Sequence, residues 1–478
     1  MLKQRLSWKR LIAVLFLFAV VISAVSFSTM EADTTPNKIQ EVYDLLNENH
    51  LEGNKEEEMT NAAIQAMVEV YGDPYTQYFN PEEWKEFQRT MQSSYVGIGV
   101  RIAQDEEGIS IVEVFDESSA KEAGLKSGDY ITAVEGNAVG DKTTSELVQE
   151  IIGPEKTKVN ITITRDGEKM DFKLERRQVQ IPAVQSFMFS DGVGYLQLNS
   201  FSEDADKEFA NGLESLQKED MQSLIIDLRN NPGGYLDIAL NISKLFIEEG
   251  TLIYTKDNKG DLEGLAIKNG KEAQHPITIM LNENSASASE VLSGALQDYE
   301  LATIVGTKSF GKGSVQRLFP LTDGSMIKIT MEEYLTPKKR KVNGEGLPPD
   351  VNVEGAAEQL ITAMHTAGVK NFNISLNEEL ISINDKEYST DVELVEENGN
   401  VYAPVRFLAS LIGAEVKWNS EAEQVELVIG EQSQVLKENE YQLYRDGKNY
   451  VDVQHFASQY SILEATAKED GWQFTIKK

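Results

Sequence analysis

The chain has 478 residues and no cysteine, which excludes a cysteine nucleophile, a thiolate-ligated metal and any disulfide bond. Its 78 acidic and 45 basic residues give a formal net charge of −33, so its electrostatics disfavour a nucleic acid as partner. The four histidines lie in no metal-ligand spacing, and we expect neither a metal nor a cofactor. A chain of this length indicates several domains.

The N-terminal residues 1–30 have the pattern of an export segment. Four basic residues precede an uncharged stretch, residues 11–30, and acidic residues follow it. This order predicts that the body of the protein lies outside the cytoplasm. The stretch is long for a signal peptide and just long enough to span a membrane, and no clean Ala-x-Ala cleavage site follows it. Both a membrane anchor and a cleaved signal peptide, which would give a secreted protein, therefore stay open.

Residues 35–92 are predicted to form an N-terminal helical domain. The apolar residues from position 38 onward recur at amphipathic helical spacing, interrupted by a turn at Asp73–Phe79. We expect this turn to belong to a helical base.

Residues 93–176 are predicted to form a small β domain. Tyr95–Val100 is a glycine-bearing loop that runs into an alternating strand, and Ala120–Ile131 is a short helix followed by a Gly-Asp turn and a strand. The two segments in this order resemble a PDZ domain, which implies that Gly97, Ile98 and Gly99 hold the terminal carboxylate of a peptide. The alternative for the first loop alone is an ordinary glycine hairpin.

Residues 177–355 are predicted to form a layered α/β core, entered through a bridging strand or linker at 177–190. Strand-like and helical segments alternate along it, which indicates helices packed on a sheet. The expected strands are 193–198, 224–228, 277–281 and 302–305, and the expected helices are 204–217, 236–248 and 288–299.

Two motifs in this core carry the predicted chemistry. Asn284–Glu290 lies where a strand turns into a helix, so a hydroxyl is placed at a helix N-terminus. Gly306–Gln316 places Lys312 between two glycines, where the backbone can bend sharply. A serine with a buried amine is a known nucleophile and base pairing. The alternatives are serines that only cap the helix, a solvated or phosphate-binding lysine loop without P-loop order, and a Ser-His-Asp triad assembled in space.

Together with Leu228–Gly234, these motifs resemble those of the carboxyl-terminal processing peptidases, also called tail-specific proteases. The resemblance runs from about residue 38 to about residue 353. It implies a crotonase- or ClpP-like core and a Ser-Lys dyad, and its site residues follow by motif position. Ser287 would be the nucleophile, Lys312 the general base and Gln316 the residue that orients it, and the amides of Gly233 and Ala288 would form the oxyanion hole.

A lysine base must be neutral for a useful fraction of the time, although its ordinary pKa is about 10.4. We therefore expect Lys312 to be desolvated in an apolar pocket. A neutral Gln316 can hold the amine without stabilising its charge. A nearby cation would also help, but we expect the neighbouring Lys308 to be exposed.

Residues 370–478 are predicted to form a small α+β domain. The segment 400–418 resembles the stalk-like domain named after the N-terminal region of copper amine oxidases, and part of it recurs 48 residues later, for example Tyr402 as Tyr450. No cluster of copper ligands occurs in it. We interpret it as an interaction module, and a homodimer through the N- and C-terminal domains is one predicted assembly.

The combined prediction is a multidomain α/β protein that works as an extracytoplasmic serine endopeptidase and selects protein substrates by their C-terminal tails. The alternative is a PDZ-based binding or scaffold protein with an inactive protease core.

Overall fold

The computed structural model describes most of the chain from Thr35 to Lys477. The described residues are 35–53, 55–91, 94–104, 108–140, 142–165, 167–377, 380–384, 386–389, 392–419, 424–436, 441–445, 447–468 and 471–477. The predicted export segment, residues 1–30, lies outside them. Within the described part, no helix is both long enough and apolar enough to cross a membrane. The chain divides into two compact units, 1–72 and 73–478.

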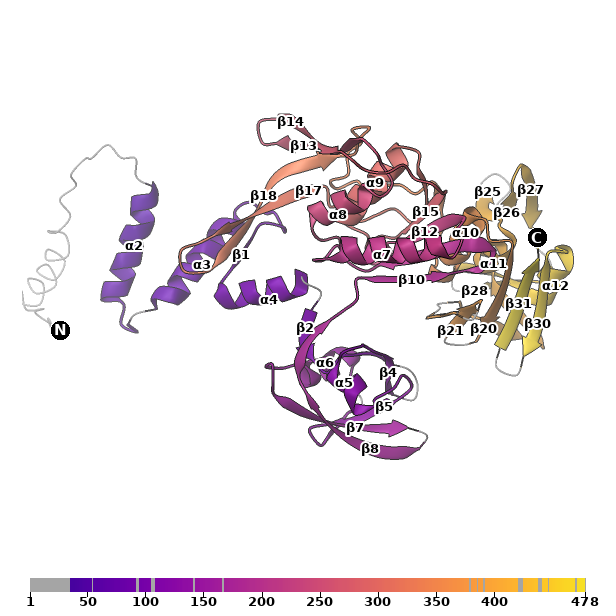
Figure 1. The fold of residues 1–478 in the computed structure, drawn as a ribbon, viewed down its shortest axis with the longest axis horizontal. Helices are drawn as coiled ribbons and strands as arrows, with labels where there is room; N and C mark the ends of the chain where they lie inside the picture. The colour runs from indigo at the N-terminus through magenta and orange to yellow at the C-terminus, as the bar shows by residue number, and fades with distance from the viewer. Residues whose placement is uncertain are drawn as a thin grey trace, which may run out of the picture. The chain divides into compact units, whose positions relative to one another are not determined.

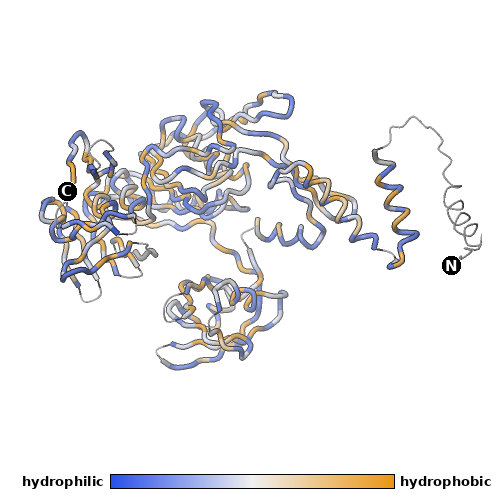
Figure 2. Tube along the Cα trace, turned by 180° about the vertical axis from the view of Figure 1, so that it is seen from behind, coloured by the Kyte–Doolittle hydropathy of each residue, from blue (hydrophilic) through white to orange (hydrophobic). Residues whose placement is uncertain are grey.

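The first unit contains the helices α2 (Thr35–Asn49) and α3 (Glu56–Glu69). Along α2, the apolar residues Ile39, Val42 and Leu46 recur at helical spacing but stay about half exposed, at 49%, 55% and 45%. Figure 2 shows the resulting alternation of apolar and polar turns. An amphipathic helix with an exposed apolar face is what the sequence predicts here.

The second unit begins with the expected turn, at residues 74–75, but the rest of the segment differs from a helical base. Gln77–Phe79 forms the strand β1, which pairs with β18 (Met326–Leu335). The pairing extends a sheet, so these residues belong with the strands that follow much later in the chain. The helix α4 (Pro81–Met91) comes next, and the Asn80 side chain caps it by accepting bonds from the amides of its first turn.

The region predicted to resemble a PDZ domain is a small sheet with two helices (Figure 1). Its main strands follow the order β3-β4-β5-β7-β8, and the short β6 pairs with β5. The strand β3 therefore has one unpaired side, to which an extended peptide can add. The elements are β2 (Ser94–Gly97), β3 (Val100–Gln104), β4 (Ile109–Val114), α5 (Ser119–Ala123), β5 (Tyr130–Val134), β6 (Asn137–Ala138), α6 (Thr144–Ile151), β7 (Lys158–Arg165) and β8 (Glu168–Glu175).

The predicted linker at 177–190 consists of two strands. The strand β9 (Arg177–Gln180) pairs with β2. The strand β10 (Val184–Met188) pairs antiparallel with β11 and becomes the edge of the core sheet. The chain thus enters and leaves the PDZ-like region along one two-stranded ribbon.

The core is a six-stranded sheet in the order β10-β11-β12-β15-β16-β19, parallel apart from β10. Helices cover both of its faces, so the strands β12 and β15 are buried at every position. On one face Leu224 and Ile279 pack with α9, and on the other Ile225 and Met280 pack with α10. The elements are β11 (Val193–Leu198), α7 (Ala205–Lys218), β12 (Ser223–Asp227), α8 (Leu236–Ser243), β15 (Ile277–Leu281), α9 (Ala288–Asp298), β16 (Ala302–Gly306), β19 (Val351–Asn352) and α10 (Ala356–Ala367).

The helix α8 ends five residues before the predicted boundary at 248. After Ser243 the chain tightens into turns in which Leu245 bonds to Ile242 and Phe246 bonds to Ser243. These turns place Phe246 and Ile247 in the core, where they are 5% and 4% exposed. Burial of two large side chains therefore overrides the helical pattern.

A second sheet lies beside the core and carries part of the site. Its order is β1-β18-β13-β14, and β17 (Ser314–Pro320) pairs with β18 as an antiparallel hairpin. The strands β13 (Gly250–Asp257) and β14 (Leu262–Ile267) complete it. The strand β18 is thus flanked by β1 on one side and β17 on the other.

The C-terminal region contains the predicted repeat as a strand-helix-strand unit that occurs twice. The strands β24 and β29 pair antiparallel, with Tyr402 opposite Asp452 and Pro404 opposite Tyr450. The elements are β20 (Asn371–Leu376), β21 (Leu380–Ile383), β22 (Lys386–Ser389), β23 (Val395–Glu397), β24 (Asn400–Pro404), α11 (Val405–Ile412), β25 (Glu415–Asn419), β26 (Gln424–Ile429), β27 (Gln432–Leu436), β28 (Gln442–Arg445), β29 (Lys448–Asp452), α12 (Val453–Gln459), β30 (Leu463–Lys468) and β31 (Gly471–Lys477).

Candidate active site

The predicted nucleophile lies on a tight turn between β15 and α9. Ser287 adopts φ 56° and ψ −116°, which differs from the extended backbone usual for a helix-capping serine. Its neighbours in the motif have structural roles: the Ser285 hydroxyl donates to the Leu228 carbonyl at 2.8 Å, and the Ser289 hydroxyl donates to the Asn231 carbonyl at 2.9 Å. Backbone strain of this kind recurs where a side chain must be presented to a site.

The loop Leu228–Gly234 packs directly against this turn. The Ala286 amide donates to the Asn231 carbonyl at 3.0 Å. Gly233 has φ +99°, and a Cβ there would lie 2.8 Å from the Ser287 Cβ and 2.9 Å from the Ala288 amide nitrogen. Only glycine fits this approach, because any side chain would collide with the nucleophile turn.

The two predicted oxyanion donors differ in this structure. Ala288 is the first residue of α9, so its N–H has no carbonyl partner within the helix. The N–H of Gly233 donates to the Asn231 side-chain oxygen at 2.9 Å. Both residues lie beside Ser287 as predicted, but the Gly233 amide must leave Asn231 before it can bind a substrate oxygen.

A buried carboxylate, Glu290, joins the serine turn to the lysine loop. Its Oε2 accepts hydrogen bonds from the amides of Ser287 and Lys312, both at 2.9 Å, and its Oε1 accepts from the Gly311 amide at 2.7 Å and from the Ser309 hydroxyl. Glu290 is 0% exposed, and this burial raises its pKa. One side chain thus fixes the separation of the two loops.

The predicted base, Lys312, is partly buried with its Nζ 4.7 Å from the centre of the Tyr75 ring. Burial lowers its pKa from the ordinary 10.5, against the opposing effect of the negative charges of Asp73 and Glu290. The desolvation required of a lysine base is therefore present. Lys308, in contrast, is exposed as expected.

The predicted orienting residue, Gln316, lies close by but holds other partners. Its amide nitrogen donates to the Ser314 hydroxyl at 2.9 Å and to the Thr330 hydroxyl at 3.3 Å. Among the described residues no hydrogen bond joins Gln316 to Lys312, or Lys312 to Ser287. The orienting role of Gln316 stays a prediction.

One cavity of about 520 Å³ contains the predicted catalytic residues. Its apolar wall comes from α4, the loop after β11 and the start of α9. The residues that line it include Trp84, Phe87, Met91, Phe201, Gly233, Gly234, Leu236, Ser287, Ala288, Val291, Lys312, Gln316, Leu318, Lys328 and Tyr334. Ser287 and Lys312, 25 positions apart in the sequence, thus face the same space.

Three contributors to this site were not predicted as such. Glu290 lies in the serine motif, three residues after Ser287, but no role was predicted for it. Tyr75 comes from the segment expected to be a turn in a helical base, and its ring lies against the Lys312 amine. Lys328 lies on β18, outside the predicted motifs, and lines the cavity.

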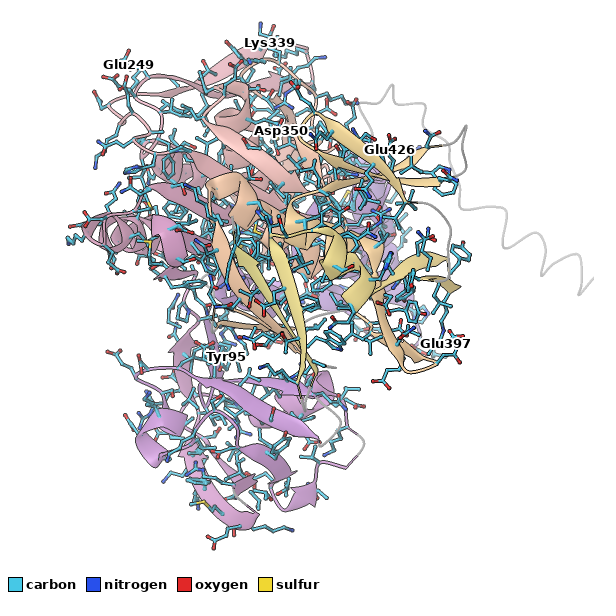
Figure 3. The ribbon with its side chains drawn as sticks, turned by 90° about the vertical axis from the view of Figure 1, so that its right-hand side faces the viewer. Tyr95, Glu249, Lys339, Asp350, Glu397 and Glu426 are labelled. Atoms are coloured by element: carbon cyan, nitrogen blue, oxygen red, sulfur yellow. The ribbon has the colours of Figure 1, made fainter. Side chains whose placement is uncertain are left out.

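The predicted tail-binding loop lies between β2 and β3. The Ile98 side chain is 1% exposed, and its carbonyl accepts a bond from the Ala120 amide at 3.0 Å. Gly99 has φ +86°, and a Cβ there would overlap Ser118. Tyr95, labelled in Figure 3, packs over Gly97 in the same way. The loop is closely packed and lies at the start of the open edge of β3, and its carboxylate-binding role stays a prediction.

We expect Glu290→Gln to disrupt this site. Glutamine offers one acceptor oxygen where four donors converge, and its own N–H groups would face two of them, which costs about 1 to 3 kcal/mol for each buried donor left unpaired. The midpoint of urea unfolding should fall, together with at least a hundredfold loss of kcat/KM. Glu249→Gln, at the exposed position labelled in Figure 3, is the matched control. An unchanged unfolding midpoint for Glu290→Gln would contradict this role.

Four protein-family profiles match the chain. Peptidase family S41 matches residues 192–353, and the PDZ domain matches residues 96–175. The copper amine oxidase N-terminal domain matches residues 361–459, and the activating protease CtpB N-terminal domain matches residues 22–83.

Relatives with curated names agree with these profiles. A Staphylococcus aureus protein named "Probable CtpA-like serine protease" is 35% identical over 321 residues, which make up 66% of this chain and 64% of the relative. A Staphylococcus epidermidis protein of the same name is 35% identical over 66% of this chain and 65% of its own length. The match therefore spans just under two thirds of these relatives.

Among solved structures, the photosystem II D1 C-terminal processing protease is similar at 26% identity and a TM-score of 0.43, over 67% of this chain and 87% of that chain. The recognition made from the motifs is confirmed by the family profiles and the relatives. Residues 192–353 thus match peptidase family S41 and residues 96–175 match the PDZ domain, the two kinds of domain that the resemblance to the carboxyl-terminal processing peptidases predicted.

Proposed function

We propose that this chain is a serine endopeptidase that cleaves protein substrates selected by their C-terminal tails. The observation that carries the proposal is the shared cavity, into which Glu290 fixes both Ser287 and the desolvated Lys312. The S41 profile and the relatives named serine proteases support the same activity.

The geometry supports a covalent mechanism. Neutral Lys312 accepts the proton of the Ser287 hydroxyl as its oxygen attacks the scissile carbonyl carbon. The Ala288 amide, joined by Gly233 once it leaves Asn231, stabilises the negative oxygen that forms. The lysine then gives its proton to the departing amine, which leaves an acyl-enzyme. A water molecule attacks the acyl carbon while Lys312 accepts its proton, and Lys312 returns this proton to the Ser287 oxygen as the acid product leaves.

Two observations indicate a resting state. The Gly233 amide is bonded to Asn231, and no described hydrogen bond joins Lys312 to Ser287. These are also the observations that favour the second candidate, a PDZ-based scaffold with an inactive core. The two candidates differ in whether the intact protein ever cleaves a tailed peptide.

For substrate selection we propose the open edge of β3. A peptide tail would add there as a strand, with its terminal carboxylate at the amides of Gly97, Ile98 and Gly99. The match of residues 96–175 to the PDZ family supports this placement. No metal or cofactor enters the proposed reaction.

For location we propose an extracytoplasmic protein, either anchored through residues 11–30 or secreted. The charge order around that segment supports this. A homodimer through the N- and C-terminal domains is part of the proposal. The exposed apolar face of α2 supports it, because such a face is usually covered in an assembly.

The first test is the dyad. Ser287→Ala and Lys312→Ala should each lower kcat/KM on a tailed peptide by about a thousandfold or more, and the double variant should be little worse, because catalytic units are not additive. The exposed Lys308→Ala is the control and should match wild type. Most of the activity surviving in Lys312→Ala would refute the assignment. An inactive wild type that still binds tails would support the scaffold.

The second test is the pH profile. Because burial lowers the pKa of Lys312, the fraction of neutral amine and hence kcat/KM should rise with pH, and level off below the ordinary value of 10.5. Asp73→Asn removes a charge that raises this pKa, so the profile should move to lower pH. A flat profile, or a shift to higher pH in Asp73→Asn, would argue against a lysine base.

The third test is the tail. Amidation of the substrate C-terminus removes the charged acceptor, so cleavage should slow by about tenfold or more, since bonds to charged groups contribute about 1.5 to 3 kcal/mol. The comparison uses two peptides that differ only in this group. Equal cleavage of the two peptides would contradict the proposal that the protein recognises the C-terminal carboxylate of its substrates.

A further inference from the structure

A second lysine, Lys328, lines the cavity that contains Ser287 and Lys312. It lies on β18, flanked by Gln77 of β1 and Leu318 of β17. Its Nζ donates to the Gln77 side-chain oxygen at 2.7 Å and lies 5.5 Å and 5.0 Å from the ring centres of Phe79 and Phe87. A cation is thus held by a neutral amide and two aromatic faces.

This ammonium group has spare bonding capacity. A lysine has three donors, and Gln77 accepts one of them. Among the described residues Lys328 makes no ion pair, although the chain has 78 acidic residues. Within the part of the chain that the structure describes, the acidic charge that acts on it comes from Asp73, whose oxygens already accept bonds from Tyr75 and Thr76.

The charge persists at neutral pH. Burial lowers the pKa of Lys328 to about 8, with a further contribution from the positive charge of Lys312 and an opposing one from Asp73. The side chain is therefore mostly protonated near pH 7. A partly desolvated cation without a counter-ion attracts an anionic group more strongly than an exposed lysine does.

The position of Lys328 in the cavity indicates which anionic group of a substrate it can bind. Tyr334, six residues further along β18, donates its hydroxyl to the Ser287 carbonyl at 3.2 Å. At about 3.3 Å per residue, the two Cα atoms on this strand are roughly 20 Å apart. The Lys328 side chain, however, lines the same cavity as Ser287 and Lys312, so an extended substrate cleaved at Ser287 passes Lys328 within a few residues of the scissile bond.

We propose that Lys328 is a specificity residue that binds the side-chain carboxylate of an Asp or Glu in the substrate, within about six residues of the scissile bond. This rests on the proposed function, because it assumes that a peptide lies in the cavity. The terminal carboxylate of the substrate is a separate group, read at the loop 97–99. Lys328 thus adds a second, internal signal to tail selection.

The experiment uses pairs of peptides that differ only by Asp against Asn, placed at each of six positions on either side of the cleavage site. Wild type should cleave the Asp peptide about tenfold faster in kcat/KM at one or two positions. Lys328→Met should abolish this ratio, and Lys328→Glu should favour a Lys at the same position. The exposed Lys308→Met is the matched control and should keep the ratio. Thermal melting establishes that each variant is folded.

A binding measurement separates this proposal from the proteolytic one. Ser287→Ala protein and fluorescent peptides with amidated C-termini report affinity without cleavage and without tail capture. The Asp peptide should bind about tenfold more tightly than the Asn peptide, and the difference should vanish when Lys328→Met is added. Equal binding at all positions, or a difference that survives Lys328→Met, would overturn the role of Lys328. The proposed proteolytic function is contradicted only if the wild-type protein cleaves none of the peptides.

Discussion

The arrangement of the site depends on one buried carboxylate. Glu290 accepts four hydrogen bonds, from Ser287 on one loop and from Ser309, Gly311 and Lys312 on the other. Because it lies in the first turn of α9, the helix that packs on the core sheet determines where the nucleophile and the lysine stand. The serine turn and the glycine-containing lysine loop are thereby held in one geometry.

Charges of both signs surround the Lys312 amine. Burial favours neutral Lys312, whereas Asp73 and Glu290 favour its ammonium form. Lys328, held by Gln77 and two aromatic rings, keeps a positive charge in the same cavity. In our proposals, Lys328 on β18 recognises a substrate carboxylate, and Lys312 in the loop before β17 transfers the proton.

Much of the core could be predicted because its strands are apolar on both faces, which gives continuous runs such as Ile277–Leu281. Ser287 and Lys312 were found through motifs, since each occupies a glycine- or serine-rich turn with a recognisable order. Lys328 and Tyr75 could not be found in this way. The pairing of β1 with β18 places the segment of Tyr75 beside Lys312 and the side chain of Gln77 on Lys328, and a three-residue strand leaves no periodicity to detect.

That short strand also explains how distant parts of the chain enter one site. Within Asp73–Phe79, Tyr75 contacts Lys312, Thr76 bonds to the Thr330 amide, and Gln77 bonds to Lys328. The helix α4 follows at once, lines the cavity with Trp84 and Phe87, and leads into β2 and the predicted tail loop (Figure 1). A ligand at that loop can change the cavity only if it binds two positions of this connection with different affinity. In the proposed function, the described part of this connection, residues 73–91, contacts the Lys312 amine through Tyr75 and precedes the predicted tail loop in the chain.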